Sequence, residues 1–182
     1  MVRFGSLRLA LAMVLAVAAC AGCGSGGSSN VSAGTYVSAV CSAISPLERD
    51  VVTRSSALNS TTAPNAAEAK KALQGFLVAV EQDATHALSK VQSAGTPNIA
   101  KGGEVAGTIV KTFTELRDAM RVAVTKSKSL PTDSPTAFRT AAQALGASVK
   151  ASLNGIDSSG LTNRDLEKAA TGEPACKSLS AG

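Results

Sequence analysis

Apolar side chains recur along this chain at alternating steps of three and four residues, which is the period of an amphipathic α-helix. Four long segments carry such a stripe, and we predict helices over about 34–58, 65–94, 103–129 and from 133 or 134 to about 156. A short fifth helix is predicted after Thr162, because Thr162 and Asp165 form a cap-like pair before Leu166. No segment keeps the alternation of a strand, so we predict no sheet.

Local sequence marks where several of these helices begin and end. Asn65 and Glu68 form a cap pair at the start of the second helix, and Gly95 followed by Pro97 ends it. The fourth helix has Pro135 in its first turn, where a missing backbone N–H costs little.

Pro46 lies inside the first predicted helix. It follows Ser45 and precedes Glu48, an arrangement that resembles the cap, first-turn proline and capping-box glutamate of a new helix. We therefore expect a kink or a restart at this point.

Short connections between helices of similar length favour antiparallel neighbours. The sequence therefore predicts an all-α, up-down four-helix bundle packed at about 20°, with a short C-terminal fifth helix. Each main helix contributes one aromatic side chain that we interpret as a core anchor: Tyr36, Phe76, Phe113 and Phe138. The fourth helix is expected to bury Phe138, Ala141, Ala142, Leu145, Val149, Leu153 and Ile156. The many alanines favour close helix packing, which leaves less room for a ligand.

The N-terminus has the pattern of an export signal. A basic segment, residues 1–8, precedes the uninterrupted apolar run Leu9–Ala19, which is about half the length of about 20 residues that a membrane-spanning helix needs. Cys20 follows Val17-Ala18-Ala19, and this group resembles a bacterial lipobox. In such proteins the cysteine thiol is diacylglycerated and the leader is cut just before it.

Two alternatives to lipidation at Cys20 remain open. Cys23 follows Ala21-Gly22, a good local match, but Cys20 then occupies the slot usually filled by an aliphatic residue. Secretion without a lipid is the other alternative. In either case Gly24-Ser25-Gly26-Gly27-Ser28-Ser29 is predicted to be a flexible tether.

These features divide the chain into three parts. Residues 1–19 are predicted to be a lipoprotein signal peptide, residues 20–32 the lipidated cysteine and tether, and residues 33–182 the helical bundle domain. The mature protein is expected on the outer face of the cell membrane, held by its lipid, or released in part.

Cys41 and Cys176 lie near opposite ends of the folded part. An even pair of cysteines in an exported chain favours a disulfide, because the chain passes into an oxidising compartment. Two cysteines and a distant histidine cannot complete a tetrahedral metal site. We therefore predict a Cys41–Cys176 disulfide.

Composition and charge narrow the function classes. The 18 basic side chains fall to 16 when Arg3 and Arg8 leave with the signal peptide, against 13 acidic ones, and the charges are interspersed. Because Lys and Arg do not cluster and aromatics make up only 3%, we predict no nucleic-acid partner.

No catalytic or metal-binding constellation stands out. Asp83 and His86 have the spacing of half a di-metal carboxylate site, but His86 is the single histidine and is predicted to face solvent. Gly102-Gly103 precedes a helix without a phosphate-loop pattern. We therefore predict no catalytic residue, no metal and no cofactor, and a protein that is not an enzyme.

The whole assembly resembles a family of small lipoproteins and secreted proteins from actinobacteria, including mycobacteria. The residues that carry the resemblance are the lipobox Val17-Ala18-Ala19-Cys20, the Gly/Ser tether, Tyr36-Val37-Ser38-Ala39-Val40-Cys41, and Ala175-Cys176-Lys177 with Leu179. The resemblance implies an envelope lipoprotein with a disulfide-closed helical bundle, and it implies no activity.

Two function classes follow from the sequence. The first is a non-enzymatic interaction module of the cell envelope that docks another envelope protein on a helix face. The alternative is a small carrier or sensor that binds an apolar ligand between helices. The sequence favours a protein partner over a small-molecule ligand, and the packing of the core discriminates the two: a loosened bundle near Pro46 would favour the ligand.

Overall fold

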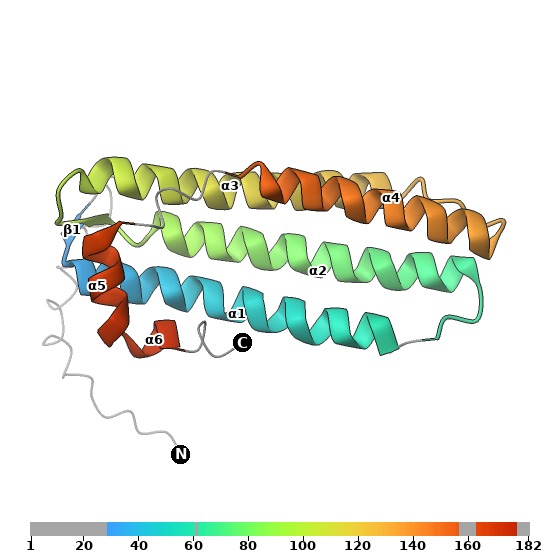
Figure 1. Cartoon of the computed structure of the whole chain (residues 1–182), viewed down its shortest axis with the longest axis horizontal. Coiled ribbons are helices and arrows are strands. Elements are labelled where there is room, and N and C mark those ends of the chain that lie inside the picture. Colours follow the sequence, from blue (N-terminus) through green and yellow to red (C-terminus); the bar gives the residue numbers. More distant parts are fainter. Residues whose placement is uncertain (1–28, 61, 157–162, 178–182) are drawn as a thin grey trace, which may run out of the picture.

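The computed structural model describes residues 29–60, 62–156 and 163–177 of the chain. Its helices are α1 (Ala33–Ser60), α2 (Ala66–Gln92), α3 (Gly102–Ser127), α4 (Pro135–Asn154), α5 (Arg164–Gly172) and α6 (Pro174–Lys177). Figure 1 shows α1, α2 and α3 running along the long axis, with α4 beside α3 over one half of the molecule and α5 beside the start of α1. The predicted all-α bundle with a short fifth helix is confirmed.

The predicted starts of α2 and α4 are confirmed by their caps. The Asn65 side chain accepts a hydrogen bond from the backbone N–H of Glu68 at 2.9 Å. Ser134 accepts from the N–H of Ala137 at 3.4 Å, and Pro135 stands in the first turn. Each cap satisfies a backbone donor that has no partner inside its own helix.

The cap of α5 differs from the expected one by a single residue. Asn163 accepts hydrogen bonds from the N–H groups of Asp165 and Leu166 at 3.0 and 3.3 Å. Asparagine caps helices at least as well as threonine, so the helix begins at Arg164. The predicted cap residue, Thr162, lies outside the described residues.

The expected restart at Pro46 is wrong, because α1 continues without interruption from Ala33 to Ser60. Proline removes one N–H from the helical ladder and leaves the carbonyl of Ser42 without its usual donor. Pro46 and Ser42 are both exposed, so water can replace that donor. The hydroxyl of Ser45 donates to the carbonyl of Cys41 at 2.9 Å instead of capping a new helix.

A short parallel bridge corrects the expectation of no sheet. β1 (Asn30–Val31) pairs with β2 (Thr96–Pro97), which lies in the connection between α2 and α3. Gly95 makes this connection possible because its φ of 83° is in the left-handed region, and a Cβ there would lie 2.6 Å from the carbonyl oxygen of Ser29.

The core consists of two apolar clusters, one toward the start of α1 and one toward the α3–α4 connection. Tyr36 and Phe113 are buried in the first cluster. Phe76 and Phe138 are only partly buried, at the edge of the second. The interpretation of all four aromatics as core anchors therefore holds for two of them.

α4 is less buried than predicted. Leu145 is its single fully buried residue, and Leu153 is 37% exposed. α4 packs mainly against α3, whereas α1 packs against α2, α5 and α6. The backbones of α1 and α4, which are neighbours in a closed four-helix bundle, do not pack closely. The bundle is therefore open along this edge.

Candidate functional site

An apolar cavity of about 410 Å³ lies where α1 and α4 fail to close the bundle. We call it the central cavity. All four long helices contribute to its wall, which is lined by Leu47, Val51, Leu73, Phe76, Leu77, Val80, Leu116, Met120, Ala142, Leu145, Gly146, Val149 and Leu153. Several of these residues are partly exposed, so the cavity opens to solvent along the α1–α4 edge.

Small residues on α4 help to create this space. Ala142 and Gly146 are one helical turn apart, so they lie on the same side of α4. A Cβ built on Gly146 has no heavy atom within 4 Å. Larger residues at these positions would fill the gap that the small ones leave.

The wall of the central cavity carries no charged side chain and no side chain with a nitrogen or oxygen. A ligand that buried a polar group there would lose its hydrogen bonds to water without replacement, at a cost of roughly 2–7 kcal/mol for an amide or hydroxyl. The cavity can therefore accept a hydrocarbon surface and excludes polar groups from its interior.

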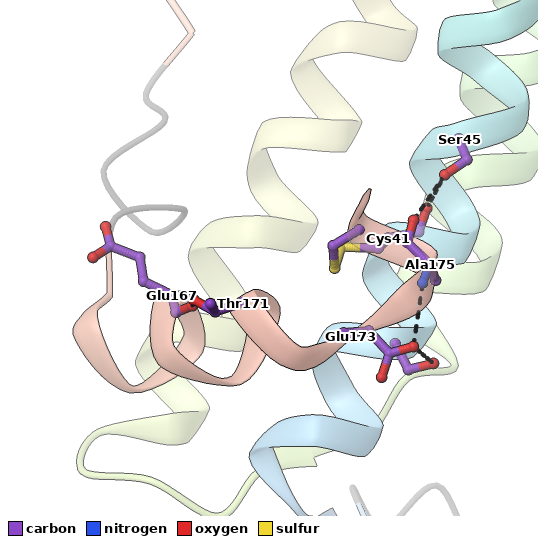
Figure 2. Close-up of a disulfide and its surroundings, with 8 residues drawn as sticks. Cys41, Ser45, Glu167, Thr171, Glu173 and Ala175 are labelled. Carbon is purple, nitrogen blue, oxygen red and sulfur yellow. Dashed lines mark hydrogen bonds between the residues drawn. A yellow bond between two sulfur atoms is a disulfide. The ribbon is translucent and has the colours of Figure 1, made fainter. Parts of the chain in front are cut away.

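A second space of about 240 Å³ lies at the other end of the bundle, beneath α5. We call it the end cavity. It is lined by Tyr36, Val37, Val40, Cys41, Ile44, Ile109, Leu166, Glu167 and Ala170. Glu167 is its single charged residue, and Figure 2 shows the Glu167 carboxylate directed away from Cys41.

Tyr36 is the residue of the end cavity whose pKa departs from its ordinary value. Its side chain is 1% exposed, and its hydroxyl oxygen has no hydrogen-bond partner among the described residues. Burial raises the pKa of Tyr36 to about 12, because the phenolate would be poorly solvated there. Tyr36 is therefore neutral at physiological pH and cannot serve as a base.

A disulfide and hydrogen bonds fasten α5 and α6 over the end cavity. Cys41 in α1 is bonded to Cys176 in α6, which confirms the predicted pairing. The hydroxyl of Ser38 donates to Glu173 at 3.1 Å. The Ser45 hydroxyl shares its single proton between the carbonyls of Cys41, at 2.9 Å, and Ala175, at 3.3 Å (Figure 2). These contacts help to hold α5 in place, because Leu166 is the single fully buried residue of that helix.

The structure does not bring the other candidate residues together. His86 is exposed on α2, as predicted. The Oδ2 atom of Asp83 is buried without a hydrogen-bond partner in the described part of the chain. Across residues 29–60, 62–156 and 163–177, no three His, Cys, Asp or Glu side chains are grouped as metal ligands.

The predicted lipidation site cannot be located in the structure. Cys20 and its alternative Cys23 lie outside the described residues, as do the signal peptide and most of the tether. No helix in the described ranges is long and apolar enough to cross a membrane.

Sequence reasoning did not predict the cavities, although it left a loosened bundle near Pro46 open as the alternative. The expectation of close packing at alanines holds for Ala84, Ala87 and Ala123, which are buried. It does not hold on α4, where Ala142 and Gly146 line the central cavity. The sequence pattern held no clear signal for the cavities, because it predicted helices of similar length, whereas α4 has 20 residues against 28 in α1. No known protein family, curated protein or solved structure matches the chain.

Proposed function

We propose that this chain is a lipid-anchored extracytoplasmic protein that binds an apolar ligand in the central cavity. One observation carries the proposal: a space of about 410 Å³ between four helices has a wholly apolar wall. Ligand sites in proteins usually measure about 300–1,000 Å³ and are lined mainly by hydrophobic side chains. The size and chemistry of the central cavity fit that description.

The physical driving force is the removal of apolar surface from water. Water in the central cavity lies against apolar side chains and finds no side-chain hydrogen-bond partner in the wall. A ligand that displaces this water gains roughly 25 cal/mol for each Å² of apolar surface it buries. Binding therefore needs no charge or metal at the site.

The proposed location supplies apolar ligands. The lipobox-like Val17-Ala18-Ala19-Cys20 and the Gly/Ser tether support an anchor on the outer face of the cell membrane. Two or three acyl chains suffice for stable anchoring. A domain that the tether holds beside a bilayer meets membrane lipids continuously, whether the anchor is at Cys20 or Cys23.

The interaction module remains the second candidate. The exposed large apolar side chains that could dock a partner protein are Val52, Val78, Val122 and Leu153. Each lies on a different helix, and singly exposed apolar residues are common on protein surfaces. They favour a partner less strongly than the cavity favours a ligand. We propose no catalytic, cofactor or nucleic-acid-binding role.

A glycine substitution tests the proposal. Gly146→Leu adds a side chain to the wall of the central cavity, at a position where an added Cβ meets no heavy atom within 4 Å, and it replaces a residue that weakens helices. We expect the full chain to bind palmitate, and the variant to bind it at least tenfold more weakly, by isothermal titration calorimetry. Gly75→Leu on α2 is the matched control, since Gly75 is also exposed with open space around its Cβ. Equal palmitate affinity in both variants would overturn the proposal.

A further inference from the structure

The two cavities lie end to end along α1. Ile44 lines the end cavity and Leu47 lines the central cavity, and these residues are less than one helical turn apart on α1. On α3, Ile109 lines the end cavity and Leu116 the central one. Both cavities therefore follow the same two helices.

Two short helices border the two cavities: α4 packs mainly on α3, and α5 packs on α1. α4 lies along the part of the molecule that holds the central cavity, and α5 lies beside the start of α1 at the end that holds the end cavity (Figure 1). A space of about 410 Å³ is smaller than two turns of a helix with a diameter of about 10–12 Å. The space that remains suits a narrow, unbranched ligand.

Core side chains of both apolar clusters lie between the two cavities. Leu47 and Leu116 pack against both apolar clusters of the core, and both are partly exposed. A leucine side chain can change rotamer without moving the backbone. A continuous channel would require such a change in Leu47 or Leu116.

The combined length matches a membrane lipid chain. From Val37 in the end cavity to Val51 in the central cavity, α1 rises by roughly 21 Å at about 1.5 Å per residue. The hydrocarbon core of a bilayer is about 30 Å thick, so one acyl chain spans about 15 Å of it. One extended acyl chain therefore fits lengthwise along α1.

We infer that the central and end cavities are two parts of one channel that binds a single long, linear acyl chain. This inference rests on the proposed function and names its ligand class. The polar head group stays in solvent, because the central cavity has no polar side chain to receive it. The chain can come from a free fatty acid or from a membrane glycerolipid.

A channel of this kind has a measurable dependence on chain length. Each methylene transferred from water into an apolar site should strengthen binding about fourfold. With the full, disulfide-bonded chain we expect the affinity for saturated fatty acids to rise from octanoate to at least palmitate. A channel limited to the central cavity would stop gaining affinity at a shorter chain.

Substitutions in the end cavity test its part in the channel. Ala170→Leu enlarges a side chain of α5 that lines the end cavity. Ile44→Phe enlarges one from α1, and it replaces the first variant if that variant fails to fold. We expect octanoate affinity to change less than twofold and palmitate affinity to fall at least tenfold. Gly103→Leu, on an exposed and open position of α3 that lines neither cavity, should change neither affinity.

The outcomes separate the two proposals. If filling the end cavity leaves palmitate affinity unchanged while Gly146→Leu lowers it, the single channel is refuted and the proposed function stands. If the unaltered chain binds no fatty acid and takes up no lipid from phosphatidylcholine vesicles, both are refuted. Native mass spectrometry, after incubation with fatty acid or with phosphatidylcholine vesicles, identifies the source of the bound chain. A bound fatty acid mass and an intact phospholipid mass would each support an acyl-chain ligand.

Discussion

At the scale of single residues, Tyr36 shows how an apolar site affects a polar group. Its hydroxyl is buried without a hydrogen-bond partner among the described residues, and burial raises its pKa to about 12. An unsatisfied buried hydroxyl costs roughly 1–3 kcal/mol. We expect Tyr36→Phe to leave the fold intact and to raise the free energy of unfolding at neutral pH by about 1 kcal/mol, measured by urea titration.

The same residue predicts a loss of stability at high pH. An unfolded tyrosine ionises near its ordinary pKa of 10.0, whereas folded Tyr36 keeps its proton until about pH 12. Between these values the unfolded state binds fewer protons, so stability falls as pH rises. Because Tyr36 is the single tyrosine, tyrosinate absorbance reports its ionisation directly. A folded-state midpoint near pH 10 would contradict the prediction, and Tyr36→Phe supplies the baseline.

Local signals such as the caps could be read from the sequence because each depends on a few neighbouring residues. Asn65 and Ser134 need only a backbone N–H three residues ahead. The behaviour of Pro46 could not be read in this way. Whether a proline breaks a helix depends on the solvent exposure and packing around it, which the local sequence does not contain.

At the scale of elements, the N-terminus of α3 depends on one glycine of a pair. A Cβ on Gly102 would collide with the backbone carbonyl of Pro97 in β2, whereas a Cβ on Gly103 has open space. We expect Gly102→Ala to lower the free energy of unfolding by at least about 2 kcal/mol, because backbone must shift. Gly103→Ala is the matched control and should be neutral or slightly stabilising. Equal melting temperatures for the two variants would contradict this explanation.

The second element-scale prediction concerns α5 and α6. The disulfide closes a loop over a sequence separation of 135 residues, and in the chain-entropy model such a closure stabilises the fold by about 5 kcal/mol. The double variant Cys41→Ala, Cys176→Ala should lose up to that amount in a urea titration. We also expect faster amide hydrogen exchange in α5, which would keep the packing of Leu166, Ala169 and Ala170 on the core and the Ser38–Glu173 hydrogen bond but lose its covalent closure.

A comparison with the chemically reduced native chain controls for the side-chain substitution itself. Both forms should show the same increase in α5 exchange, while α2 and α3 keep their protection because they pack more extensively against each other than any other pair of elements. Unchanged exchange in α5, in both the double variant and the reduced chain, would show that packing alone holds α5 over the end cavity.

At the scale of the whole molecule, the periodicity of apolar residues was sufficient to predict an all-α bundle. It was not sufficient to predict the cavities, because they arise from differences between helices. α4 is shorter than α1, and it packs on α3 instead of closing against α1. The small residues Ala142 and Gly146 look like close-packing positions in the sequence and become cavity wall only when no helix approaches them.

Membrane attachment is the remaining prediction at this scale. If Cys20 carries the lipid, the full chain expressed in a bacterium that processes lipoproteins should partition into the detergent phase. Its N-terminal peptide should begin at Cys20 and carry the mass of a diacylglyceryl group. Cys20→Ala should move the protein to the aqueous phase, and the matched variant Cys23→Ala should leave partitioning unchanged. The reverse pattern would assign the lipid to Cys23. An unmodified terminus at Ala21 or Gly24 would refute the lipid anchor, and with it the argument that the domain is held beside the bilayer where its proposed ligand resides.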